Sequence, residues 1–280
     1  MRYKTSDGLN LYVEVSGKGL PCLFLHGRPG YWSKSFQHFA DNLLNKNVQM
    51  IYLDQRGCGR SEHSPEQDYS LHRIMQDIEE LRTQLGITEW LIMGHSFGGI
   101  LAVNYAHQFA THVKGLILSN VTLNMFDSFQ QQISKGTTIL HKPPKKADTE
   151  KLELFMESYY EVLISLMEKG LYDTLQFVDV ENKKAVDLVD REGLQSDPNF
   201  QQFIFSSQEY FQDFTLLTKE ISKPVLVIAG EQDYAVGPKH HTSFNFHDQK
   251  VKVLRSAHHP YVEDQENFQQ ALSEFFFGVT

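Results

Sequence analysis

The sequence has little cysteine, with only Cys22 and Cys58 among 280 residues. Two cysteines offer no disulfide framework, which excludes a small fold held together by disulfides. The sequence also lacks an apolar run of about 18 residues, the length that a membrane-spanning helix needs, and it lacks a basic, apolar N-terminal segment. We therefore expect neither membrane spanning nor secretion, and we expect a cytoplasmic protein.

Positive charge is scarce as well. The 26 Lys and Arg residues are outnumbered by 35 Asp and Glu residues, which gives a net charge of -9. This acidic balance disfavours nucleic acids and anionic membranes as partners. The 13 histidines are scattered without an H-E-x-x-H or Cys/His spacing, so the sequence predicts no metal site. A small molecule or a short peptide remains as the expected partner, and the oligomeric state stays open.

Short apolar runs alternate with segments of helical period, which favours an α/β fold with a mostly parallel sheet covered on both faces. Residues 9–15 alternate as an antiparallel edge strand would. Residues 71–85 have apolar positions at helical spacing, and Gly86 follows them as a helix end. Continuous buried strands are predicted at four places: residues 23–25, 50–53, 91–93 and 116–118.

The strand pattern stops near residue 120 and resumes at Pro224. In the interval, aromatic and aliphatic residues from 155 to 166 follow helical spacing, and residues 141–146 form a loop rich in Lys and Pro. A second domain with its own function is the alternative to a helical cap. We favour the cap, inserted after the sixth strand, because the flanking strands belong to one sheet and the interval has no motif of its own. The predicted division is a core of residues 1–120 and 221–280 and a cap of residues 121–220.

Residues 94–98 read Gly-His-Ser-Phe-Gly, with an apolar run before them and a helix-like run after them. In this setting a G-x-S-x-G pattern is typical of a nucleophile elbow, a strained strand-to-helix turn that exposes the serine hydroxyl. Side chains at Gly94 and Gly98 would collide with the neighbouring backbone. The sequence therefore predicts Ser96 as a nucleophile.

A serine hydroxyl is a poor nucleophile at neutral pH, so it needs a base and a carboxylate that orients the base. Asp233 and His258 each follow an apolar run, and the order Ser, acid, His is the order of α/β-hydrolases. Glu231 is an alternative acid, and we favour Asp233 because a shorter side chain suits a strand-to-loop turn. His259 is an alternative base, and we favour His258 because it begins a His-x-Pro pattern before an acidic helix start.

Acyl transfer places negative charge on the carbonyl oxygen, and two backbone N–H groups can stabilise it. The first predicted donor is the N–H of Phe97, at the N-terminus of the helix that follows the elbow. The second is the N–H of Arg28, in the loop at residues 26–30, which reads His-Gly-Arg-Pro-Gly. Nothing in this acyl-transfer scheme requires a cofactor.

The chain resembles α/β-hydrolases of the proline-iminopeptidase-like branch in four segments: the loop at 26–30, the loop at 54–61, the elbow at 94–98, and the surroundings of Asp233 and His258. The loop at 54–61, Asp-Gln-Arg-Gly-Cys-Gly-Arg-Ser, is the most specific of them. We expect its Asp54 and Arg56 to brace the end of the sheet and not to catalyse. The resemblance implies the α/β-hydrolase fold, with a mostly parallel eight-stranded sheet, helices on both faces and an inserted helical cap.

The resemblance also implies a serine hydrolase that acts on a small ester or an N-terminal aminoacyl amide, as a carboxylesterase or a proline-iminopeptidase-like aminopeptidase. A lactonase or a C–C bond hydrolase on the same fold is the alternative, and a slow ligand sensor that retains the triad is an alternative of another class. Turnover of a substrate panel discriminates among them.

Recognition of a free substrate amine in that family relies on carboxylates of the cap. The candidates in this chain are Glu157, Glu161 and Glu209. The chain departs from the family pattern at Arg28, where a second glycine is usual. It also departs in the elbow, which commonly reads Gly-Gly-Ser-Trp-Gly in the family.

Overall fold

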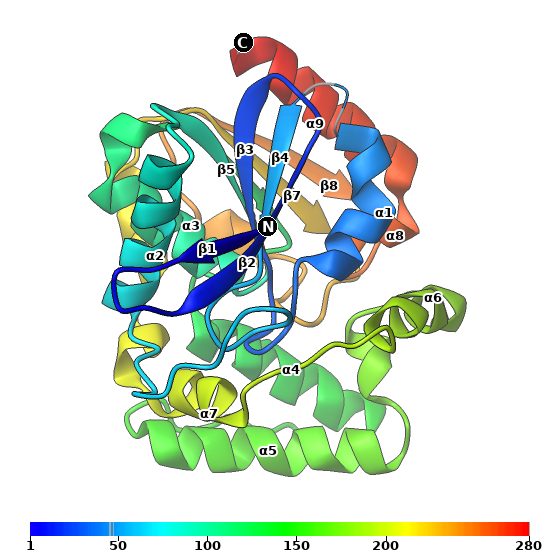
Figure 1. The fold of residues 1–280 in the computed structure, drawn as a ribbon. Helices are drawn as coiled ribbons and strands as arrows, with labels where there is room; N and C mark the ends of the chain where they lie inside the picture. The colour runs from blue at the N-terminus through cyan, green and yellow to red at the C-terminus, as the bar shows by residue number, and fades with distance from the viewer. Residues whose placement is uncertain (45, 47, 280) are drawn as a thin grey trace.

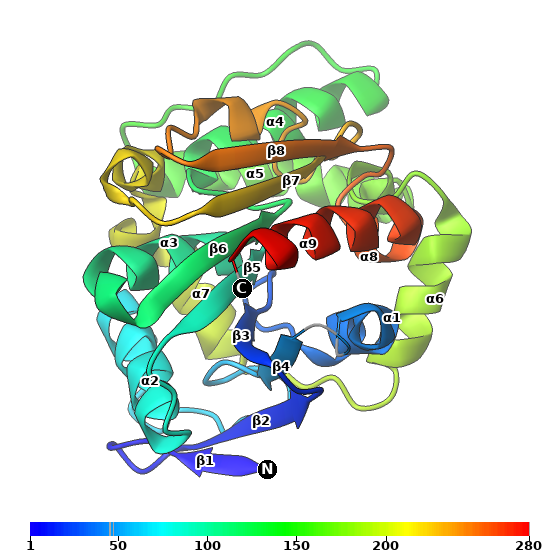
Figure 2. The same cartoon turned by 90° about the horizontal axis from the view of Figure 1, so that it is seen from above.

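The computed structural model describes residues 1–44, 46 and 48–279, which form an eight-stranded sheet with helices on both faces (Figures 1 and 2). The strands are β1 (Arg2–Lys4), β2 (Asn10–Ser16), β3 (Leu20–Leu25), β4 (Val48–Leu53), β5 (Trp90–His95), β6 (Val113–Ser119), β7 (Val225–Gly230) and β8 (Gln249–Leu254). Their order across the sheet is β1-β2-β4-β3-β5-β6-β7-β8. Strands β3 to β8 pair in parallel and β1 and β2 are antiparallel, so the predicted mostly parallel sheet is confirmed.

The edge of the sheet differs from the sequence prediction. The alternating run at 9–15 forms β2, which is antiparallel as expected, but it lies between β1 and β4. Strand β1 pairs with it through Tyr3 opposite Leu11 and occupies the edge. A strand of three residues is too short to show an alternation, and this is why the sequence did not indicate it.

The apolar runs of the parallel strands are continuous because both faces of the sheet are buried. In β5, Ile92 packs into the cluster on one face, whereas Leu91 and Met93 pack into the cluster on the other. Helices α2 and α3 cover the first face, and α1, α8 and α9 cover the second (Figure 2). These two layers hold the carboxyl ends of the strands in place, and the site described below lies there.

The α-helices are α1 (Lys34–Leu44), α2 (Leu71–Gln84), α3 (Gly98–Gln108), α4 (Met125–Ile139), α5 (Leu152–Glu168), α6 (Val180–Asp190), α7 (Pro198–Ser206), α8 (Pro260–Glu263) and α9 (Gln265–Val279). Short 3-10 turns lie at Ala110–His112, Tyr172–Leu175, Gln208–Phe211, Phe214–Glu220 and His240–Ser243. The predicted helix at 71–85 is confirmed, and Gly86 follows it with φ +66°. None of the described helices is long and apolar enough to cross a membrane.

Helices α4 to α7 lie in the sequence between β6 and β7. In Figure 1, α4, α5 and α7 lie together beyond the ends of the strands, and α6 lies at the side near α1. Phe129 of α4 stacks on Tyr159 of α5 with 4.3 Å between ring centroids. Both rings belong to the same hydrophobic cluster as Leu118 of β6, so these helices share one core with the sheet. This favours a cap over an independent domain, and the boundaries at 120/121 and 220/221 stay a prediction.

The loop at 54–61 braces the end of the sheet, as expected. Asp54 accepts hydrogen bonds from the Ser33 backbone N–H (2.8 Å) and from Arg60 Nε (2.7 Å). Arg56 is fully buried and donates to both carboxylate oxygens of Asp77 on α2, at 2.6 and 2.8 Å. The loop is thereby tied to the segment before α1 on one side and to α2 on the other.

We expect Asp77→Ala to lower the free energy of unfolding by about 3–5 kcal/mol, because it leaves the buried Arg56 guanidinium without its main partner. Urea unfolding followed by circular dichroism measures the change. The control is Glu181→Ala, which removes the exposed Glu181–Lys184 pair (2.7 Å) and should have a far smaller effect. Equal, small losses in the two variants would contradict a bracing role for Arg56.

Candidate active site

Ser96 lies in the turn between β5 and α3 and has φ +54°. A residue other than glycine in this region is strained, and such strain clusters at functional turns. The turn is closed tightly: a Cβ atom added at Gly94 would lie 2.6 Å from the Gly98 carbonyl oxygen. One added at Gly98 would lie 2.1 Å from the carbonyl oxygen of Leu25, at the end of β3. The predicted collision of side chains at Gly94 and Gly98 with the backbone is confirmed.

His258 and Asp233 lie side by side after β8 and β7. The two side chains are buried, and His258 Nδ1 is 2.9 Å from Asp233 Oδ2. Burial raises the pKa of Asp233, but the charge and hydrogen bond of His258 and further donors outweigh it, so this pKa lies below its ordinary value. Asp233 is therefore a carboxylate at neutral pH. His258 Nδ1 donates to it, which leaves Nε2 available as a base.

The alternative acid and base lie in other surroundings. Glu231 is exposed, and its backbone N–H donates to the Leu254 carbonyl oxygen. His259 Nδ1 is 2.9 Å from the Tyr261 hydroxyl, and its ring stacks on Phe177 with 4.5 Å between centroids. The geometry thus favours Asp233 over Glu231 and His258 over His259.

Asn120 supports the acid and was missed by the sequence analysis. Its Nδ2 donates to Asp233 Oδ2 (2.8 Å) and to the Ala257 carbonyl oxygen (2.9 Å). The other carboxylate oxygen of Asp233 accepts from the backbone N–H groups of Ala235 and Val236, at 3.0 and 3.2 Å. Asn120 has φ +52° and directly follows β6. A polar residue directly after a buried strand was the available signal.

We expect Asn120→Gly to lower kcat by about 10- to 100-fold with a smaller change in KM, since the amide positions Asp233 and lies behind it. Glycine keeps the positive φ, so the change removes only the amide. Steady-state kinetics measures kcat and KM separately. An unchanged kcat would show that the amide does not act through Asp233.

Two further histidines lie beside these residues and brace them. His95 Nε2 donates to the His258 carbonyl oxygen over 2.9 Å, and burial, with the charge of His258 adding to it, lowers the pKa of His95 to about 3. His26 Nε2 accepts from the Gln55 backbone N–H (3.1 Å). Both rings are buried and neutral. His95 ties the elbow to the backbone of His258, and His26 ties the loop of Arg28 to the loop at 54–61. In the described part of the chain, no group of His, Cys, Asp and Glu side chains is arranged to hold a metal ion.

Two small cavities meet at Ser96 and His258, and Arg28 lines both. The first, which we call the apolar lobe, has a volume of about 100 Å³, and its apolar lining includes Met125, Phe129, Tyr159, Phe205 and Val236. The second, the polar lobe, has a volume of about 80 Å³, and its polar lining includes Tyr31, Lys183, Asp187 and Asp190. Among the described residues, no hydrogen bond joins the Ser96 hydroxyl to the His258 ring.

The two predicted oxyanion donors lie at the apolar lobe. Arg28 and Phe97 both line it, and neither backbone N–H donates a hydrogen bond within the described residues. A Cβ atom added at Gly27 would lie 2.5 Å from Ser96 Cβ, so the loop of Arg28 rests against the elbow. Arg28 itself has φ +42°, which turns its backbone sharply after β3. Two such backbone N–H groups next to the Ser96 hydroxyl are suited to stabilise the negative charge that develops on a carbonyl oxygen.

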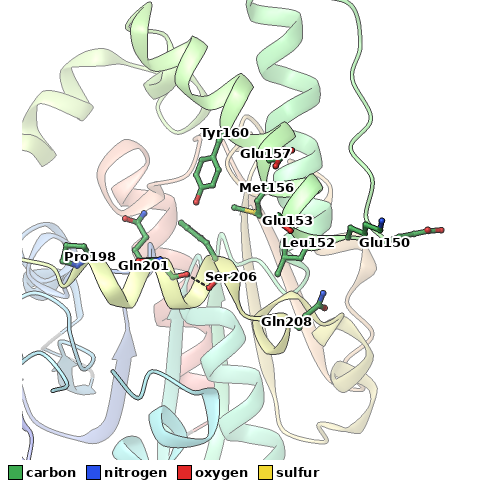
Figure 3. A pocket seen from close by; sticks show the side chains of 13 residues that line it. Glu150, Leu152, Glu153, Met156, Glu157, Tyr160, Pro198, Gln201, Ser206 and Gln208 are labelled. Atoms are coloured by element: carbon green, nitrogen blue, oxygen red, sulfur yellow. Dashed lines mark hydrogen bonds between the residues drawn. The ribbon is translucent and has the colours of Figure 1, made fainter. Parts of the chain in front are cut away.

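The three cap glutamates lie away from both lobes. Glu161 is exposed and pairs with Lys145 at 2.5 Å. Glu209 accepts from the Leu71 backbone N–H (3.2 Å) at the start of α2. Glu157 is exposed and lines a separate groove between α5 and α7 (Figure 3). This placement disfavours the expectation that these side chains reach a substrate amine beside Ser96.

The carboxylates that line the polar lobe come from α6 instead. Asp187 is 2.6 Å from Lys183 Nζ. Asp190 accepts from the Tyr31 hydroxyl (2.8 Å) and the Ser35 hydroxyl (2.6 Å), which joins α6 to the segment around α1. The sequence did not single out these residues, because acids spaced along an amphipathic helix are equally typical of a solvated face.

Comparisons with known proteins identify the family and the fold. A family model described as alpha/beta hydrolase fold matches residues 21–265. The proline iminopeptidase of Neisseria gonorrhoeae is 38% identical over 124 residues, which are 43% of this chain and 39% of that protein, so the match spans about two fifths of the relative's length. That of Heyndrickxia coagulans is 26% identical over 95% of this chain and 93% of its own.

A solved structure shows the same fold along the whole chain. The proline iminopeptidase-related protein from Thermus thermophilus superposes with a TM-score of 0.84 at 22% identity, covering 100% of this chain and 96% of that one. The iminopeptidase relatives agree with the branch that the loop at 54–61 indicated. Since the family model matches most of its length, the chain belongs to the alpha/beta hydrolase fold family.

Proposed function

We propose that the chain is a serine hydrolase that transfers the acyl group of a small ester or an N-terminal aminoacyl amide to water. The observation that carries this proposal is the Asp233–His258 hydrogen bond beside a cavity that the strained Ser96 also lines. The family match and the iminopeptidase relatives support hydrolysis as the reaction class. Because those relatives are proline iminopeptidases, an N-terminal prolyl amide is the first amide to test.

In this mechanism Ser96 Oγ attacks the carbonyl carbon while His258 Nε2 takes the hydroxyl proton. The backbone N–H groups of Arg28 and Phe97 hold the oxyanion, and Asp233 stabilises the imidazolium. His258 then gives its proton to the leaving group, and the acyl-enzyme remains. Water then attacks the acyl carbonyl carbon while His258 Nε2 takes its proton. The bond from that carbon to Ser96 Oγ breaks, His258 returns the proton to Oγ, and the carboxylic acid is released. We propose that the hydrogen bond between the Ser96 hydroxyl and the His258 ring forms when the substrate binds, because catalytic hydrogen bonds tighten in the substrate complex.

A substrate panel tests the proposal directly. Aminoacyl arylamides, prolyl arylamide among them, are compared with short acyl p-nitrophenyl esters, and kcat/KM is measured for each. We expect multiple turnovers on at least one of the two kinds, all of them abolished by a serine-directed inhibitor. Covalent labelling of Ser96 without turnover on any member would contradict hydrolysis and favour a ligand sensor.

The amine anchor, if the substrate has a free amine, belongs on α6 in this proposal. We expect Asp187→Asn to lower kcat/KM for aminoacyl arylamides by about 10-fold relative to uncharged esters, because a charge-assisted hydrogen bond to the amine is lost. The matched control is Glu161→Gln, which also removes a carboxylate paired with a lysine but lies away from both lobes. Equal ratios in the two variants would mean that Asp187 does not contact the amine.

A further inference from the structure

A large groove lies between α5 and α7, outside both lobes (Figure 3). Its volume is about 1080 Å³. In Figure 3, Met156 and Tyr160 extend from α5 into the space above α7, and Gln201 rises from α7 on the other side. Leu152 adds a further apolar side chain to the lining. Neither the proposed mechanism nor the proposed amine anchor uses this groove.

The groove and the apolar lobe share one lining residue among those described, Phe205 near the end of α7. On its inner side the ring of Phe205 contacts Phe129 edge-on, with 5.7 Å between centroids. Helix α5 likewise contributes to both spaces, with Tyr159 lining the lobe and Met156 lining the groove. Phe205 is half-buried, so its ring faces both the core and the groove. One aromatic ring therefore lies between the two spaces.

The volumes indicate why a connection matters. The apolar lobe holds about 100 Å³ and the polar lobe about 80 Å³, whereas binding pockets for small molecules range from about 300 to 1,000 Å³. A cavity of about 150 Å³ is filled by one benzene molecule, so the apolar lobe takes only a short acyl group. A longer acyl group at Ser96 needs further space, and the groove is the larger space that shares the lining residue Phe205 with the apolar lobe.

We propose that the groove between α5 and α7 is an outer subsite for the distal part of a long, uncharged acyl chain, and that Phe205 controls the passage to it. This inference rests on the proposed function, since it needs an acyl group at Ser96. Leu152, Met156 and Tyr160 supply apolar contact for the chain. Glu150, Glu153 and Glu157 outnumber Lys151 at the rim, so the end of the chain that arrives there is not anionic.

The test is the dependence of kcat/KM on chain length. The substrates are p-nitrophenyl acetate, butyrate, hexanoate and octanoate, together with the mono-p-nitrophenyl ester of suberic acid, which has the octanoate length and a terminal carboxylate. We expect the native enzyme to hydrolyse octanoate better than the suberate ester. Phe205→Ala should raise the octanoate-to-acetate ratio of kcat/KM by about 10-fold, and Phe205→Trp should lower it by about 10-fold.

The control is Phe203→Ala, a change of the same kind on the same helix. Phe203 lies against Tyr69 and Tyr210 and lines neither space, so its loss should leave the ratio where it was. A third variant, Gln201→Trp, fills the groove from α7 and should lower the same ratio. The outer subsite would be overturned if Phe203→Ala and Phe205→Ala changed the octanoate-to-acetate ratio equally. It would also be overturned if Gln201→Trp left that ratio unchanged. Turnover of arylamides without hydrolysis of any p-nitrophenyl ester would also overturn the outer subsite. Absence of Ser96-dependent turnover on every ester and every arylamide of the panel would instead overturn the proposed function.

Discussion

Replacing Ser96 by alanine should abolish hydrolysis and covalent labelling by a fluorophosphonate probe together. The change removes the only atom proposed to attack the carbonyl carbon, and the loss in kcat should be on the order of 10⁶-fold, as for the removal of other serine nucleophiles. Alanine keeps the volume of the elbow nearly unchanged, so the fold should persist. Hydrolysis is measured on the best substrate of the panel, and labelling is measured by mass spectrometry of the intact chain.

The matched control is Ser134→Ala, on the exposed side of α4. This variant should be labelled and should hydrolyse substrate as the native chain does. Labelling that survives in the Ser96 variant, or that maps to another serine, would overturn the assignment of the nucleophile. Loss of labelling with hydrolysis retained would show that the reaction does not pass through an acyl-serine.

Removal of the base should cost about as much as removal of the nucleophile. We expect His258→Ala to reduce kcat nearly as far as Ser96→Ala, because the members of a triad act as a unit. Asp233→Asn keeps the size of the side chain but favours the wrong tautomer of His258, and it should lower kcat by about 10⁴-fold. Steady-state kinetics with all three variants on one substrate gives the comparison.

His259→Ala serves as the control for the base. The ring of His259 stacks on Phe177 and meets the Tyr261 hydroxyl, so its loss should affect packing and cost far less in kcat. The reverse ranking of the two histidines would mean that the ring next to Asp233 is not the one that takes the proton.

The sequence predicted best those parts of the site that local backbone geometry determines. The elbow was recognisable because its turn requires glycine at 94 and 98 wherever the rest of the chain lies. The loop at 54–61 was recognised by its resemblance to the proline-iminopeptidase-like branch, and its Asp54 and Arg56 bind Ser33 and Asp77. The continuous apolar runs predicted the sheet because both of its faces are buried.

The parts that the sequence did not predict depend on how distant segments meet. Asn120 can donate to Asp233 and to the Ala257 carbonyl oxygen only because these residues meet at the ends of three strands. The surroundings of the cap acids could not be predicted, because the face that each helix turns toward Ser96 follows from packing between helices. Glu161 and Asp187 are both acids on amphipathic helices, and only their contacts distinguish them.

Strands β6 and β7 are neighbours in the sheet, although helices α4 to α7 separate them in the sequence. The segment that contains α4 to α7 is therefore a single insertion. The chain leaves the sheet at the end of β6 and returns to it in the neighbouring strand, β7. The entropy of closing such a loop grows only with the logarithm of its length, about 0.6 kcal/mol for each doubling. Exchange of the segment for one of another length should thus disturb the pairing of Leu116 with Val225 very little. A segment of another length can therefore take the place of α4 to α7 while the residues at the strand ends keep their positions.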